Sequence, residues 1–288
     1  MTVNSASAAS AAMRADGVRA GYRGTDVVHD ASVRLTAGRV TALIGPNGSG
    51  KSTLLRTMAA LHPATAGRID LGGGTAVRDL APKELARRLT LLSQARPTPG
   101  GVTVREVVEY GRHPYRPRWG PGDTEGPEVV RRVMEMTGVT DLAPRPVDSL
   151  SGGQLQRVWL ASCLAQDTPV LLLDEPTTFL DLRYQVELLD IVRDLADAHG
   201  IAVGLVLHDL DQAAAVADDI VLLVGGRIAA TGTPAEVMTA SLLTAAYGID
   251  VDVHRDPDSG LVHARPRARH HGRLRQPRTR NTPERNTP

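Results

Sequence analysis

The sequence predicts an α/β fold in which a largely parallel sheet is preceded by antiparallel strands and interrupted by a helical insertion. Short apolar runs alternate with helical stretches along most of the chain, a pattern typical of a parallel sheet covered by helices. The alternation stops over about 95–150, where helical stretches at 103–111 and 127–138 enclose a loop rich in proline and arginine. Residues 18–36 indicate antiparallel strands that begin the fold.

Most elements can be located from local patterns. Short apolar runs bounded by polar or turn-forming residues fit buried strands of a parallel sheet. These runs are 40–45, 88–94, 169–176 and 201–209. Helices are expected over 51–61, 181–200 and 210–218. The second of them ends in His199 and Gly200, a helix C-terminal signal. Residues 219–232 predict a hairpin that turns at Gly225–Gly226.

Composition divides the chain into a leader, a body and a tail. Its 288 residues, 42% of them apolar, can bury the core of one large domain or two small ones. We expect a disordered leader over 1–14, a folded domain over 15–250, a short C-terminal extension over 251–264 and a disordered tail over 265–288. No run of 18 apolar residues predicts a membrane span, and the small polar start lacks the features of a secretion signal. The single cysteine, Cys163, excludes an internal disulfide, fits a reducing compartment and is expected to be a small buried residue on a helix.

Positive charge is concentrated in the tail. Residues 265–288 contain eight arginines and one glutamate, a net +7, so the rest of the chain sums to −6 although the whole carries only +1. The tail is rich in arginine and proline and has almost no apolar residues, so it cannot bury enough surface to fold alone. Binding to anionic lipid or nucleic acid is one interpretation. A solvated disordered end is the simpler one, and we expect no nucleic-acid partner.

The stretch GPNGSGKS, from Gly45 to Ser52, matches the phosphate-binding P-loop pattern. It stands between a predicted strand and a predicted helix start, where glycines let backbone N–H groups turn inward toward phosphate oxygens. We expect Lys51, one of only two lysines beside 31 arginines, to place a point charge on the β- and γ-phosphates of ATP. Ser52 is expected to bind Mg²⁺. The predicted nucleotide-binding residues of this loop are Gly45, Pro46, Asn47, Gly48, Ser49, Gly50, Lys51, Ser52 and Thr53. A glycine-rich structural turn is the alternative.

Two acids, Asp174 and Glu175, end the predicted strand 169–176. At the end of a strand the chain turns, so both side chains can face the phosphates. Asp174 is expected to hold Mg²⁺, and Glu175 to orient a water molecule and accept its proton. Glu175 and Lys51 therefore belong to the predicted catalytic residues. An ordinary polar strand end is the alternative.

A second glycine motif, LSGGQ at 150–154, opens another predicted helix. With the P-loop upstream and LLLDEP downstream, it resembles the ATP-binding subunit of ABC transporters over about residues 15–250. The resemblance implies a P-loop NTPase fold of the ABC cassette type, with an antiparallel β subdomain and a helical insertion. It also implies that two cassettes pair head to tail, each ATP lying between one P-loop and the partner's signature segment. The signature segment comprises Ser151, Gly152, Gly153 and Gln154. Its helix N-terminus would offer free N–H groups and a positive dipole end to the γ-phosphate.

Four further residues match motifs of that family. Tyr22 in GYRG matches the aromatic residue that stacks on adenine, and Gln94 matches the Q-loop glutamine that contacts nucleotide and Mg²⁺. Asp181 in FLD matches the D-loop aspartate, and His208 in VLHD matches the catalytic switch histidine. Simpler roles exist for each. Tyr22 could be a core residue of an edge strand, and Gln94 an ordinary polar loop residue. Asp181 could be a helix N-cap, and His208 a structural histidine.

The stretches YGRHP and TTFLDL resemble the importers of ferric siderophores, haem or cobalamin, with a ferric siderophore as the expected cargo. The resemblance implies a peripheral subunit on the cytoplasmic face of the cell membrane, paired with a second cassette. It would dock on two membrane permease subunits through the insertion and the Q-loop region, and act indirectly with a substrate-binding protein. An exporter cassette is one alternative. A non-transport ABC protein is another, although such proteins usually carry tandem cassettes or long coiled coils, which this chain lacks.

Overall fold

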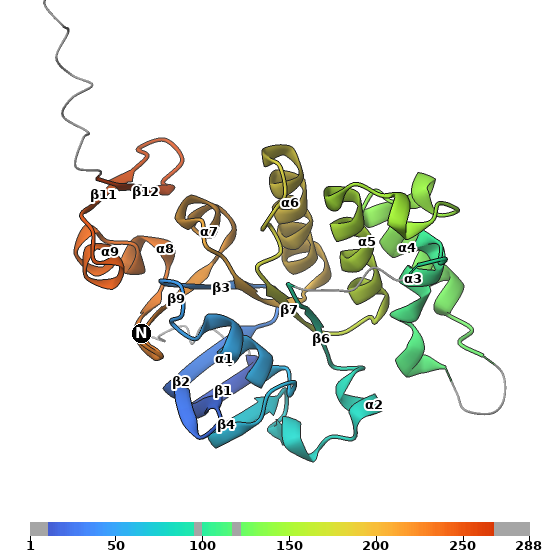
Figure 1. Cartoon of the computed structure of the whole chain (residues 1–288), viewed down its shortest axis with the longest axis horizontal. Helices are drawn as coiled ribbons and strands as arrows, with labels where there is room; N and C mark the ends of the chain where they lie inside the picture. Colours follow the sequence, from blue (N-terminus) through green and yellow to red (C-terminus); the bar gives the residue numbers. More distant parts are fainter. Residues whose placement is uncertain (1–10, 95–99, 117–121, 268–288) are drawn as a thin grey trace, which may run out of the picture.

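The computed structural model describes residues 11–94, 100–116 and 122–267, and a six-stranded sheet forms its centre (Figure 1). The strand order is β10-β9-β3-β8-β7-β6, with β10 antiparallel to β9 and the other neighbours parallel. A four-stranded antiparallel sheet, β2-β1-β4-β5, and a two-stranded one, β11-β12, complete the β structure described. The predicted α/β class, the antiparallel subdomain and the helical insertion are therefore confirmed.

The elements have the following bounds. The strands are β1 Ala11–Tyr22, β2 Thr25–Thr36, β3 Val40–Ile44, β4 Ala64–Leu71, β5 Thr75–Ala76, β6 Leu89–Leu92, β7 Val170–Asp174, β8 Ala202–Val206, β9 Asp219–Val224, β10 Arg227–Gly232, β11 Val251–Arg255 and β12 Val262–Pro266. The helices are α1 Lys51–Met58, α2 Pro82–Leu85, α3 Val104–Tyr110, α4 Gly126–Met136, α5 Gly152–Ala165, α6 Leu182–His199, α7 Leu210–Val216, α8 Pro234–Val237 and α9 Ala240–Tyr247. Short 3₁₀ turns lie at Val77–Asp79, His113–Tyr115, Thr140–Leu142 and Val147–Ser149.

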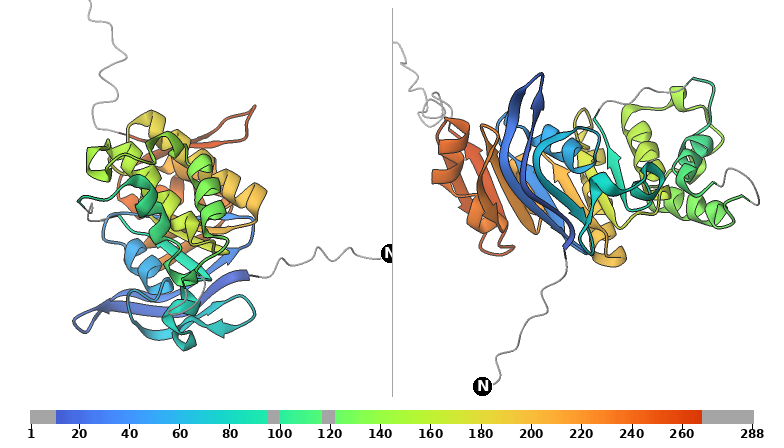
Figure 2. Two further views of the ribbon diagram at one scale, coloured as in Figure 1. Left: turned by 90° about the vertical axis from the view of Figure 1, so that its right-hand side faces the viewer. Right: turned by 90° about the horizontal axis from the view of Figure 1, so that it is seen from below.

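The parallel strands of the six-stranded sheet are largely buried on both faces, as their apolar runs predict, whereas the edge strand β10 is partly exposed. Helix α1 lies between the six-stranded sheet and the four-stranded sheet, whereas α6 and α7 cover the other face of the six-stranded sheet (Figure 1). Strand β3 shows the division: Leu43 packs in the cluster that contains α1, β1 and β2, while Ala42 and Ile44 pack in the cluster that contains α6, α7 and the insertion. Successive side chains of a strand point to opposite faces, so this five-residue strand contributes to both layers. Figure 2 shows α3 and α4 of the insertion, with α5 after them, at one end of the molecule and α8–β12 at the other.

Two predicted boundaries are wrong. Strand β1 begins at Ala11, and Met13 is fully buried, so the predicted leader 1–14 is wrong over its last four residues. These small residues become part of a strand because β2 and β4 pair with them on both sides. Residues 1–10 lie outside the described part of the chain.

At the other end, residues 251–266 form the β11–β12 hairpin, so the predicted tail is wrong at its start. Arg265 pairs with Asp252 in the register, and the guanidinium of Arg267 donates to the Asp252 carboxylate at 2.6 Å. The Arg267 backbone N–H also donates to the carbonyl of Asp250. The rest of the predicted tail, 268–288, lies outside the described residues.

Truncation tests this revised boundary. A chain that ends at Arg267 should keep the melting temperature of the full chain, because every described contact remains. A chain that ends at Ala264 should melt about 2–4 °C lower, the change expected from losing one or two backbone hydrogen bonds in a domain of this size. Calorimetry of the three chains makes the comparison. Equal melting temperatures for the two truncations would mean that the end of β12 contributes nothing.

The predicted loop 112–123 is held at its base by a buried ion pair. The Arg112 guanidinium donates two hydrogen bonds to the Asp123 carboxylate, at 2.6 and 3.0 Å, and a third to the carbonyl of Ala165. The same guanidinium stacks on the ring of Tyr115, 3.9 Å from its centroid. The hydrogen bond from Arg112 to Ala165 attaches the loop to the end of α5. Residues 117–121 of the loop lie outside the described part of the chain. In the described residues no helix has the length and apolar character needed to cross a membrane.

Candidate functional site

The P-loop connects β3 to α1 and depends on glycine where the chain turns most sharply. Gly45 has φ +141°, and a Cβ there would lie 2.0 Å from the carbonyl oxygen of Leu223 on the neighbouring strand. Gly50 has φ +97° immediately before the helix begins. Neither conformation is open to an ordinary side chain. Glycine is therefore required at both ends of the loop.

The Lys51 side chain lies inside the loop. Its ammonium donates to the carbonyl oxygens of Gly45 at 2.8 Å and Pro46 at 3.0 Å, and the residue is only 5% exposed. Burial lowers the pKa of Lys51, an effect that the carboxylates of Glu175 and Asp174 oppose. The Lys51 ammonium is thus bound only by two neutral backbone carbonyls, and an anion such as phosphate could replace them.

A hollow of about 410 Å³ opens beside this loop, a volume in the range of ligand pockets. Its lining is Val27, Asn47, Gly48, Ser49, Gly50, Lys51, Ser52, Thr53, Glu175 and His208. Within the described part of the chain, the buried hydroxyl of Ser49 has no hydrogen-bond partner. A buried polar atom is normally paired, so this hydroxyl fits a site that receives polar oxygens from a ligand.

Asp174 ends β7 with its carboxylate fully enclosed. The Ser52 hydroxyl donates to one of its oxygens at 2.6 Å, and the Arg56 guanidinium approaches the other at 3.2 Å. Hydroxyl and carboxylate oxygens are the donors that Mg²⁺ prefers, and here two of them lie together at the end of the P-loop. Arg56, one turn of α1 after Ser52, was not predicted. The sequence shows that Arg56 lies one helical turn after Ser52, but it does not show that Arg56 pairs with Asp174, 118 positions away.

The carboxylate of Glu175 contacts two other predicted site residues, Gln94 and His208. Gln94 donates its amide N–H to one carboxylate oxygen at 2.6 Å, and His208 Nε2 lies 2.5 Å from the other. These residues follow β6, β7 and β8, whose carboxyl ends share one edge of the sheet. Glu175 itself has φ +53°, an uncommon conformation for a residue with a side chain and one that clusters at functional sites. The amide nitrogen of Gln94 is engaged with Glu175, so its oxygen is the atom left for a metal ion.

Tyr22 lies at the end of β1 and outside the lining of this hollow. It is 48% exposed, so its alternative role as a core residue is wrong. Its ring stands against that of His62, with centroids 4.4 Å apart, and His62 Nε2 lies 2.8 Å from the carbonyl oxygen of Gly21. Sequence reasoning missed His62, because no local pattern links it to Tyr22 across 40 positions.

The signature segment is separate from the P-loop. Ser151 caps α5: its hydroxyl accepts from the N–H of Gln154, whose side chain accepts from the N–H of Ser151. Ser151 and Gly152 are exposed, and no residue of the segment lines the hollow beside the P-loop. Helix α5 follows the insertion and packs against its helices α3 and α4, on the far side of β6 and β7 from α1 (Figure 1). Asp181 caps α6 by accepting from the N–H of Tyr184, so its predicted capping role is confirmed.

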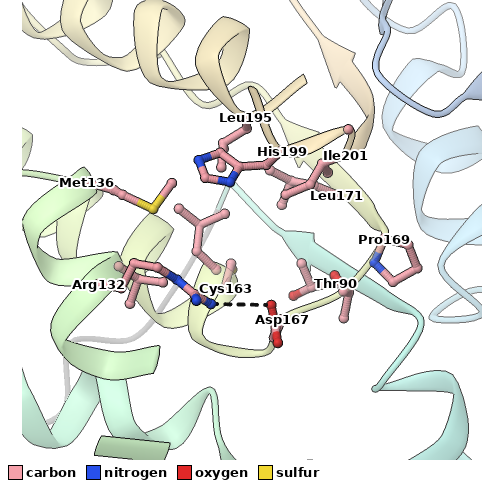
Figure 3. A pocket seen from close by; sticks show the side chains of 14 residues that line it. Thr90, Arg132, Met136, Cys163, Asp167, Pro169, Leu171, Leu195, His199 and Ile201 are labelled. Carbon is pink, nitrogen blue, oxygen red and sulfur yellow. Dashed lines mark ion pairs between the residues drawn. The ribbon is translucent and has the colours of Figure 1, made fainter. Parts of the chain in front are cut away.

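A second cavity, of about 360 Å³, lies where the insertion meets the amino ends of β6, β7 and β8 (Figure 3). Arg132 of α4 and Asp167, which follows α5, form an ion pair of 3.8 Å across it, with His199 on the opposite wall. Cys163 also lines it, a buried residue on α5 as predicted. This edge of the sheet is opposite to the edge that carries Glu175, so the cavity is not part of the candidate nucleotide site.

A P-loop between a parallel strand and a helix, with two acids at the carboxyl edge of the same sheet, defines a P-loop nucleotide-binding domain. Residues 28–178 match the ABC transporter family. The chain belongs to this family.

Relatives with assigned roles are similar over most of their length. The ferric enterobactin transport ATP-binding protein FepC of Escherichia coli is 43% identical over 250 residues, covering 87% of this chain and 92% of FepC. The iron(3+)-hydroxamate import ATP-binding protein FhuC of Bacillus subtilis is 40% identical over 237 residues, covering 82% and 88%. The cobalamin import ATP-binding protein BtuD of Halobacterium salinarum is 44% identical over 243 residues, covering 84% and 60%.

Two solved structures are similar in fold. An inward-facing metal-chelate type ABC transporter matches with a TM-score of 0.77 at 25% identity, covering 90% of this chain and 98% of that one. A dimeric bacterial ABC transporter cassette matches with a TM-score of 0.67 at 25% identity, covering 77% and 98%.

Proposed function

We propose that this chain is the ATP-hydrolysing subunit of an importer, and that Glu175 is its general base. The observation that carries the proposal is the convergence of Gln94 and His208 on Glu175, beside the hollow that the P-loop lines. A carboxylate held there can take a proton from a water molecule that attacks the γ-phosphate. His208 orients the carboxylate from one side and Gln94 from the other. Lys51 neutralises phosphate charge, and Tyr22 with His62 offers a ring surface for adenine.

The residues at the end of the P-loop fit a magnesium ion. The orphaned Ser49 hydroxyl, the Ser52 hydroxyl and the Asp174 carboxylate are hard oxygen donors near the same hollow. Ser52 and Asp174 would hold the ion, and the Gln94 amide oxygen would face it. A bound ion held by these residues would neutralise part of the phosphate charge.

The signature segment would complete a site in a second chain. It is exposed, and it lies outside the lining of its own P-loop hollow. The similarity to a dimeric cassette supports pairing of two copies. We further propose that two permease subunits hold the pair at the cytoplasmic face of the membrane, that a substrate-binding protein delivers the cargo, and that the insertion and the region after Gln94 form the docking surface.

The cargo we propose is a ferric siderophore or a related metal chelate, such as haem or cobalamin. The proposal is supported by the names of the similar proteins FepC, FhuC and BtuD, which state transport of ferric enterobactin, iron(3+)-hydroxamate and cobalamin. The site residues of this chain do not bear on the cargo, because an ATP-binding subunit need not contact it. The similarity to a metal-chelate type transporter points the same way.

Uptake by the source organism tests the cargo. Deletion of the gene should abolish uptake of a labelled ferric chelate and slow growth under iron starvation. The intact gene should restore both, and a Glu175→Gln gene should restore neither, since it would supply a chain that binds but does not turn over ATP. Uptake of every ferric chelate, of haem and of cobalamin at the normal rate in the deletion strain would contradict the proposal.

A further inference from the structure

The two glycines of the signature segment have different surroundings. A Cβ built on Gly152 would meet no atom within 4 Å, so this residue faces open space. A Cβ built on Gly153 would lie 2.6 Å from Cδ2 and 2.7 Å from Cγ of Tyr184. Gly153 is buried because the Tyr184 ring occupies the place of its missing side chain. Real Cβ atoms do not approach carbons so closely, so even alanine at 153 would force the ring or the helix to move.

Tyr184 comes from the first turn of α6, directly after the D-loop. Its backbone N–H donates to the carboxylate of Asp181, which fixes the start of that helix. Its ring crosses to α5 and also lies under the guanidinium of Arg157, whose central carbon is 5.0 Å from the ring centroid. Gly153 and Arg157 are one helical turn apart, so they present one face of α5 to the ring.

Neighbouring contacts join the same two segments. Arg157 Nη1 lies 3.4 Å from a carboxylate oxygen of Glu187 on α6. The side chain of Gln156 donates to the carbonyl of Pro176 at 3.0 Å, in the segment between Glu175 and α6. These contacts join the amino-terminal half of α5 to the start of α6 and the segment before it, and the Tyr184 ring lies against Gly153.

We propose that Tyr184 is a positioning residue that fixes the signature segment relative to the D-loop, so that both are presented to the nucleotide of a second chain as one rigid surface. The proposal rests on the role proposed above for the signature segment. In this arrangement Gly152 leaves room for the ligand, whereas Gly153 leaves room for Tyr184. The contact depends on the aromatic ring of Tyr184. In the described structure its hydroxyl makes no hydrogen bond, so phenylalanine should pack equally well.

Three variants test the packing, with ATP-dependent pairing of differently labelled chains as the measurement and the Glu175→Gln change present throughout to prevent turnover. Tyr184→Ala and Gly153→Ala should each weaken pairing by about ten- to a hundredfold, because small misplacements of a functional group have effects of this size. Tyr184→Phe should pair normally. The double variant Gly153→Ala/Tyr184→Ala should pair as well as Tyr184→Ala alone, because the new methyl group has space once the ring is gone. Losses that multiply in the double variant, or a defect in Tyr184→Phe, would overturn the proposal.

Mixed pairs distinguish positioning from a general loss of stability. When a Lys51→Ala chain meets a Ser151→Arg chain, the one intact composite site uses the signature segment of the Lys51→Ala chain. Tyr184→Ala should therefore weaken pairing when it is placed in that chain, and have no further effect in the Ser151→Arg chain. Equal effects in both chains, or no effect in either, would overturn the role of Tyr184. Failure of the mixture to pair before Tyr184 is changed would instead overturn the proposed role of the signature segment.

Discussion

Glu175→Gln should lower ATP hydrolysis by about 10²- to 10⁴-fold, the usual contribution of a general base, while ATP binding stays near its normal level. The amide has almost the shape of the carboxylate, and its oxygen can still accept the hydrogen bond from Gln94 or His208. It cannot accept a proton from water at neutral pH. Because binding depends on the P-loop and hydrolysis on the carboxylate, the variant should accumulate as ATP-bound pairs, visible by size-exclusion chromatography.

The matched control is Glu128→Gln, the same chemical change on an exposed residue of α4 that pairs with Arg131. It should hydrolyse ATP at the normal rate. Hydrolysis by Glu175→Gln within about threefold of the control would exclude Glu175 as the general base. Loss of ATP binding in Glu175→Gln would show that the residue has a mainly structural role.

The central sheet could be predicted from the sequence because its strands carry a strong local signal. Strands covered on both faces are continuous apolar runs, and those that became β3, β7 and β8 are buried throughout. The hairpin of β9 and β10 was predicted correctly from Gly225 and Gly226, which both have positive φ. The motif residues Lys51, Asp174, Glu175 and His208 could be placed near one another for a related reason: each follows a strand whose carboxyl end lies at one edge of the sheet.

The elements that were missed or misplaced lack such a signal. Strand β4, Ala64–Leu71, is exposed over its first five residues, and the alternation of its apolar residues is broken at Gly67, so no sustained strand pattern marks it. It is a strand because β1 and β5 pair with it. The start of β1, which begins with two alanines, is a strand because β2 and β4 pair with it. Pairing between distant segments decides both cases, and propensity does not.

The same limit applies to the site. Arg56, His62 and Tyr184 act through contacts with Asp174, Tyr22 and Gly153, and these partners are far away in the sequence. Motif spacing identifies the residues that follow one strand or open one helix. It does not identify the side chains that hold them in place from another element.

Mixing two defective chains should restore ATP-dependent pairing that neither shows alone, the result expected if the signature segment serves another chain's nucleotide. Lys51→Ala removes the charge inside the P-loop. Ser151→Arg removes the hydroxyl that caps α5 and places a large cation at the helix N-terminus. Each chain by itself should pair at least about tenfold less well, since one lost charged contact accounts for a change of that size.

The composition of a mixed pair explains the recovery. One of its two sites combines both defects, whereas the other combines the sound P-loop of the Ser151→Arg chain with the sound signature segment of the Lys51→Ala chain. That intact site should hold ATP and support pairing between the two labelled chains, measured by fluorescence energy transfer. Arg14→Ala, a change of an exposed β1 residue outside both elements, should pair normally and serves as the control. If both variants are folded and the mixture shows no recovery, then residues 151–154 act on the nucleotide of their own chain, because in that case every chain in the mixture still carries one broken element.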